Sequence, residues 1–98
     1  MSRFVRSDSV VSRVISNETL IVPVRRGVGD LSSIYSLNPV ASTIWEALAQ
    51  PRSEEEIVEL IEKKFDVPSE VASFDVASFL AEMTAAGLAN AVEAEVAA

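Results

Sequence analysis

A chain of 98 residues suits a single domain. It carries 15 acidic and 8 basic residues, and its net charge of −7 disfavours a nucleic-acid partner, because phosphate binding depends on clustered Lys and Arg. Cysteine and histidine are both absent from the sequence, which excludes disulfides, thiolate or imidazole metal sites, and Ser-His-Asp or Cys-His catalysis. We therefore expect a protein that is not an enzyme and needs no cofactor.

The sequence contains no targeting or membrane segment. No apolar run approaches the roughly 20 residues that a membrane-spanning helix needs. Residues 1–9 are polar and lack the apolar core of a signal peptide. We expect a cytoplasmic protein in which residues 1–9 form a flexible arm.

Two strands are predicted after this arm. Residues 10–15 and 19–22 are short and rich in β-branched side chains, and the turn chemistry between them favours a hairpin. Pro23 cannot donate to a sheet ladder, so we expect the pairing to end near Val22 or to contain a bulge. Residues 25–30 are predicted to form a hairpin loop, because they lack both the glycine pattern and the Lys-Ser/Thr pair of phosphate-binding loops.

A third strand is predicted over residues 31–37. Side chains alternate between the two faces of a strand. One face would carry Leu31, Ser33, Tyr35 and Leu37, and the other would carry Ser32, Ile34 and Ser36. The serines make this strand too polar to be buried on both faces, so we place it at an edge of the sheet.

The apolar pattern changes from short β-rich runs to helical spacing at Asn38 and Pro39, where a helix is predicted to begin. Asn is a good N-cap, and Pro fits the first helical position, where its missing N–H costs nothing. Apolar residues at helical spacing then predict one buried stripe. Its members are Val40, Ala41, Ile44, Trp45 and Leu48. Trp45 is the only tryptophan and lies in mid-stripe, so we expect it to be the largest single contributor to the core.

A second helix is predicted to begin at a capping box formed by Ser53 and Glu56. Acidic residues in its first turn and lysines in its last turn both favour the helix dipole. We interpret the acidic first turn as structural rather than as a pair of catalytic carboxylates. The predicted buried stripe consists of Ile57, Leu60, Ile61 and Phe65.

A third helix is predicted from about Phe74 to Ala86, after a short turn at residues 70–73. Its apolar stripe consists of Val76, Phe79, Leu80 and Met83. Gly87 lies where a left-handed C-terminal cap belongs, and Leu88 is expected to pack just beyond it. Residues 89–98 are rich in alanine and acidic side chains, so we expect a loosely ordered tail.

This order of elements resembles the PqqD family, the small proteins of pyrroloquinoline quinone biosynthesis, and the wider group of precursor-peptide recognition elements. The resemblance rests on Tyr35, Leu37 and Asn38 followed by Ile44 and Trp45, and it runs from about residue 10 to residue 88. Further matching positions are Glu18, Ile57, Val58, Asp75, Val76, Phe79, Leu80, Gly87 and Leu88. The sequence departs from the pattern in two places: Ala41 stands where many relatives have Gly, and residues 25–33 make a longer second hairpin. The resemblance implies an α+β fold over residues 10–88, a three-stranded antiparallel sheet followed by three helices in winged-helix style.

The resemblance also implies a function. Such proteins are peptide chaperones that capture the leader of a ribosomally made precursor peptide by β-strand addition and present it to a modifying enzyme, often a radical SAM protein. The leader would lie between the third strand and the third helix. The peptide-binding residues implied by position are Leu31, Ser32, Ser33, Ile34, Tyr35 and Ser36 on the strand, and Val76, Phe79, Leu80 and Met83 on the helix.

Physical chemistry supports peptide capture at the strand, because an edge strand exposes unpaired N–H and C=O groups to which an extended peptide can add. For the helix, an apolar stripe normally packs in the core, and partial exposure of Met83 would fit both interpretations. The alternative function is a winged-helix DNA-binding regulator. Its recognition helix would need basic residues, whereas residues 74–86 contain Asp75 and Glu82 and neither Lys nor Arg. A homodimer in which two unpaired strand edges pair with each other is a further possibility.

Overall fold

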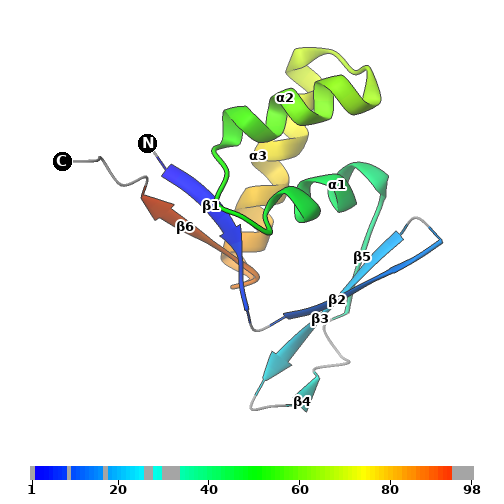
Figure 1. Cartoon of the computed structure of the whole chain (residues 1–98), viewed down its shortest axis with the longest axis vertical. Helices are drawn as coiled ribbons and strands as arrows, with labels where there is room; N and C mark the ends of the chain where they lie inside the picture. The colour runs from blue at the N-terminus through cyan, green and yellow to red at the C-terminus, as the bar shows by residue number, and fades with distance from the viewer. Residues whose placement is uncertain (1, 9, 17, 26–27, 30–33, 94–98) are drawn as a thin grey trace.

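The computed structural model describes residues 2–8, 10–16, 18–25, 28–29 and 34–93. Three helices gather on one side of the molecule, and an antiparallel sheet extends away from them (Figure 1). The molecule measures 39 × 37 × 18 Å along its principal axes. The predicted fold class, an antiparallel sheet followed by three helices, is confirmed.

The main sheet is built around the long strand β3 (Glu18–Arg25). β2 (Val10–Ile15) pairs with β3 along one edge, in a register that sets Ile15 opposite Glu18. The strand predicted over residues 10–15 is therefore confirmed. β4 (Val28–Gly29) pairs antiparallel with the end of β3. Within the predicted hairpin loop of residues 25–30, residues 26, 27 and 30 lie outside the described residues.

β5 (Tyr35–Leu37) pairs antiparallel with β3 on the same edge as β4. It takes up the part of β3 from Thr19 to Ile21, and β4 begins its pairing at Val24. Pro23 lies between these two segments, opposite the first residue of β2. The partner on that edge thus changes at the proline, whose missing N–H cannot contribute to a ladder.

The two ends of the described chain form a second sheet. β1 (Ser2–Arg6) pairs antiparallel with β6 (Ala89–Glu93), and the two strands lie side by side in Figure 1. β1 is also held by reciprocal bonds with Arg52: the Phe4 N–H donates to its carbonyl at 2.7 Å, and its own N–H donates to the Phe4 carbonyl at 2.9 Å. The expected flexible arm and loose tail therefore contain a paired strand each, because the two segments satisfy one another's backbone groups.

α1 (Pro39–Ala47) begins as predicted. The Asn38 side chain accepts a hydrogen bond from the Ala41 N–H at 2.8 Å, which satisfies one of the free donors of the first turn. Trp45 is 1% exposed and is the largest fully buried side chain among the described residues. Its predicted place at the centre of the core is confirmed, and the Arg6 guanidinium lies 5.5 Å from the centre of its ring.

α2 (Glu54–Phe65) begins at the predicted capping box, in which Ser53 and Glu56 each accept from the other's backbone N–H. Ile57 and Ile61 are buried as predicted. The prediction for Leu60 is wrong: its side chain is 42% exposed. The buried face of a helix is decided by its neighbours, and α2 turns Leu60 away from α1 and α3.

α3 (Ser69–Ala85) is longer than predicted, because residues 69–73 continue the helix instead of forming a separate turn. Pro68 immediately precedes it, where a proline does not interrupt helical bonding. Gly87 has a φ of +76°, and the Leu88 N–H donates to the Met83 carbonyl at 2.9 Å. This is the predicted left-handed cap, with Leu88 packed into the core at 3% exposure.

Candidate functional site

A cleft of about 250 Å³ opens between α1 and α3. The wall on α1 is formed by Asn38, Val40, Ala41 and Ile44. The wall on α3 is formed by Asp75, Ser78, Phe79 and Glu82. The cleft therefore combines an apolar interior with a polar and acidic rim.

The α1 wall follows from how that helix begins. The side chain of Asn38 is engaged in capping, so this end of the cleft is held in one backbone conformation. Val40 and Ala41 are half-buried, and Ile44 is 1% exposed at the base of the wall. Small and branched apolar side chains at this corner leave room that a bulkier helix surface would fill.

The α3 wall is a stripe beside the most apolar face of that helix. Asp75, Ser78 and Glu82 follow one another at i, i+3 and i+7, so they lie along one side of α3. All three are exposed, and Phe79 next to them is 8% exposed. The wall therefore presents two carboxylates on either side of an aromatic edge.

β5 leads directly into this cleft, because it ends at Leu37, the residue before the α1 N-cap. β5 contacts α1, and α1 in turn contacts α3, so the strand leads to the helix that forms one wall of the cleft. One edge of β5 is paired with β3, and within the described residues no strand pairs with its other edge. That edge offers backbone donors and acceptors to an added strand.

The faces of β5 are as predicted for the residues that can be compared. Leu37 is buried at 6% exposure and Tyr35 is half-buried against the core. Ile34 and Ser36 are exposed, and the Ser36 hydroxyl donates to a Glu18 carboxylate oxygen at 3.5 Å. Three other predicted binding residues lie outside the described residues: Leu31, Ser32 and Ser33.

The four residues predicted on the third helix occupy different positions relative to the cleft. Phe79 lines it. Val76, Leu80 and Met83 are 0%, 2% and 1% exposed and form part of the core beneath it. Met83 is therefore not the partially exposed member of the set. The direct contact of these three side chains with a peptide stays a prediction.

Sequence reasoning missed the polar half of the cleft. Asp75, Ser78 and Glu82 are not among the predicted binding residues, because that prediction rests on the most apolar stripe of α3, which packs inward. The neighbouring stripe could have been found from its spacing and from the absence of lysine and arginine on the helix. The α1 wall had no separate signal, since Val40 and Ala41 follow the same periodicity as the core residues.

Glu56, in the acidic first turn of α2, has the structural role predicted for it in the capping box. The pKa of Glu56 is lowered by hydrogen bonds from the Ser53 backbone and side chain, so this carboxylate is held ionised within the capping box. Within the described ranges, no group of acidic side chains is arranged to hold a metal ion. None of the helices in that part of the chain is long and apolar enough to cross a membrane.

Fold and cleft together define a small winged-helix-like α+β domain with an open strand edge beside a helical cleft. The family model of PqqD, described as coenzyme PQQ synthesis protein D, matches residues 18–89. The chain belongs to the PqqD family, as the resemblance of its sequence predicted.

Two solved structures are similar over most of the chain. TbiB1, solved in complex with the TbiA(beta) leader peptide, is 27% identical, with a TM-score of 0.74 over 93% of this chain and 99% of that chain. Lasso peptide synthetase B1, complexed with the leader peptide, is 17% identical, with a TM-score of 0.71 over 89% of this chain and 96% of that chain; it shows a shared fold. A search of curated proteins found no match.

Proposed function

We propose that this protein captures the leader segment of a ribosomally made precursor peptide by β-strand addition at β5. The observation that carries the proposal is the open edge of β5, which runs into the cleft between α1 and α3. Main-chain hydrogen bonds would supply affinity there, and side-chain pockets would supply specificity. TbiB1, which shares the fold at 27% identity, was solved with a leader peptide, and this supports the same occupant here.

The protein acts as an adaptor that presents the bound leader to a peptide-modifying enzyme. Without histidine or cysteine, its candidates for acid–base chemistry are carboxylates. Glu56, whose pKa is lowered, is engaged in a helix cap and is a poor proton donor. The PqqD family membership favours a radical SAM enzyme as the recipient, as in pyrroloquinoline quinone biosynthesis.

The DNA-binding alternative is disfavoured by the third helix. α3 carries Glu70, Asp75 and Glu82 and has no basic residue with which to contact phosphates. A second copy of the chain could use the same open edge, which would make a homodimer a competitor of the peptide rather than an independent property.

Proline substitution along β5 tests the proposal. Backbone donors on an edge strand alternate between the sheet and solvent, so Ile34→Pro and Ser36→Pro remove donors that point one way, and Tyr35→Pro removes one that points the other way. One of these two classes should keep parental circular dichroism and melting but no longer bind a peptide selected from a displayed random library, measured by calorimetry. Ser32→Pro and Ser33→Pro extend the scan towards the preceding residues.

Alanine at the same positions is the matched control, because it retains the N–H and should retain binding. The proposal fails if every well-folded proline variant binds as the parent does. It also fails if amide shifts on adding the peptide map to α2 instead of β5 and α3. Sedimentation of the free protein reports whether a homodimer occupies the edge.

A further inference from the structure

Building on the proposed function, we infer that the preferred peptide carries an apolar residue flanked by two basic residues, in the order basic-x-apolar-x-basic. The apolar side chain enters the cleft between α1 and α3. The two basic side chains meet Asp75 and Glu82 on its rim.

The apolar position follows from the interior of the cleft. Phe79, which is 8% exposed, lines the cleft from α3, and Val40 and Ala41 contribute half-buried side chains from α1. A cleft of about 250 Å³ accommodates a single large side chain such as leucine or phenylalanine. Burial there releases water from apolar surface on both partners.

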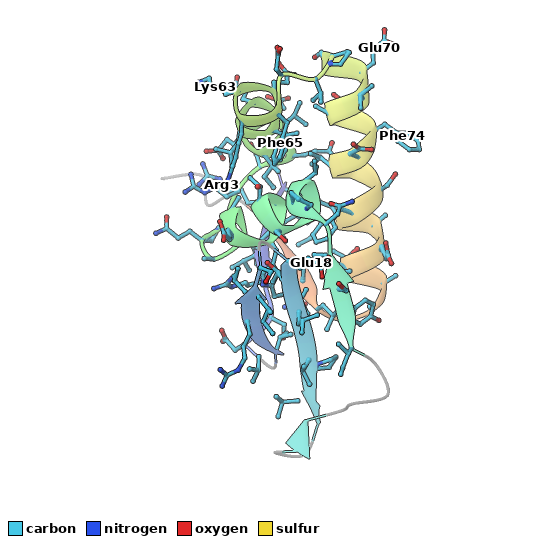
Figure 2. All side chains as sticks on the ribbon, turned by 90° about the vertical axis from the view of Figure 1, so that its right-hand side faces the viewer. Arg3, Glu18, Lys63, Phe65, Glu70 and Phe74 are labelled. Atoms are coloured by element: carbon cyan, nitrogen blue, oxygen red, sulfur yellow. The ribbon has the colours of Figure 1, made fainter. Side chains whose placement is uncertain are left out.

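The basic positions follow from the charge of the rim. Asp75 and Glu82 are exposed, and among the described residues neither side-chain carboxylate is held in an ion pair or hydrogen bond. All eight lysines and arginines of the sequence lie outside α1 and α3. Figure 2 shows the labelled Lys63 and Arg3 on the side of the molecule away from α3. The two carboxylates are therefore available to a cationic ligand.

The order of the residues follows from the spacing. Asp75 and Glu82 are seven positions apart, or about 10.5 Å along the helix axis. An extended peptide places residues i and i+4 on one face about 13 Å apart, with residue i+2 between them. Long, flexible lysine or arginine side chains bridge the difference of about 3 Å, and the middle residue then faces Phe79.

A displayed library of random peptides, selected at low salt on the full chain, tests the inference. We expect enriched sequences to carry the basic-x-apolar-x-basic pattern. A synthetic peptide of an enriched sequence should bind the double variant Asp75→Asn/Glu82→Gln about five- to tenfold more weakly than the parent, the range expected for two exposed ion pairs. This difference should shrink at high salt, which screens exposed charges.

The control is Glu59→Gln/Glu70→Gln, which changes net charge by the same amount at exposed helical positions outside the cleft. Equal weakening by both double variants would overturn the inference, since it would indicate general attraction to an acidic protein. Selection of peptides that lack basic residues would overturn the inference too. The proposed strand addition would still stand if proline substitution in β5 abolished the binding of those peptides. Failure to select any peptide would count against both this inference and the proposed function.

Discussion

Trp45 shows how much a single residue contributes to this small domain. Its indole is buried between the sheet and the helices, with the Arg6 guanidinium over one face. Trp45→Ala should lower the free energy of unfolding by about 3–5 kcal/mol, because it leaves a large cavity in a small core. Thermal and denaturant melting measure the loss. If the variant melted within a few degrees of the parent, Trp45 would not be a major contributor to the core.

Glu56 makes stability depend on pH. Its pKa is lowered in the folded protein, chiefly by the hydrogen bond from the Ser53 backbone, so its contribution is complete above the ordinary glutamate pKa. That contribution is lost as the pH falls through the lowered pKa. Glu56→Gln retains an acceptor for the capping box but cannot titrate. Melting from neutral to acidic pH should therefore fall less steeply in Glu56→Gln than in the parent; parallel curves would contradict this.

At the scale of elements, the pairing of β1 with β6 distinguishes a structural strand from a flexible arm. Phe4 packs against the core, and its backbone bonds to Arg52. Phe4→Ala should cost about 1–3 kcal/mol, the range for truncating a partly buried aromatic side chain. Arg3→Ala, at the exposed neighbouring position, is the control and should cost less than about 0.5 kcal/mol. If both variants melted at the same temperature as the parent, β1 would contribute nothing to stability, as expected of a flexible arm.

At the scale of the whole molecule, the distribution of charge separates peptide capture from nucleic-acid binding. The net charge of −7 and the acidic α3 oppose contact with phosphates. We expect no mobility shift of random duplex DNA at low salt, where electrostatic binding is strongest. A shift at micromolar protein would contradict this prediction and revive the regulator alternative.

Local signals in the sequence determined much of the fold. The N-cap at Asn38, the capping box at Ser53, the left-handed cap at Gly87 and the burial of Trp45 were all predictable. Each depends on residues within a turn or two of one another, where side-chain chemistry and helical periodicity act directly. The candidate strand edge was found in the same way, from the polarity of the residues that precede α1.

Only the tertiary structure decided the rest. β1 and β6 are short and far apart in the sequence, so neither carries a signal of its partner; their backbone groups pair because the fold brings the two segments together. Leu60 has the spacing of a core residue but meets no covering element. On α3 the apolar stripe packs inward and the adjacent stripe with Asp75 and Glu82 borders the cleft. Periodicity defines the stripes of a helix, but the neighbours packed around it decide which stripe stays open to a ligand.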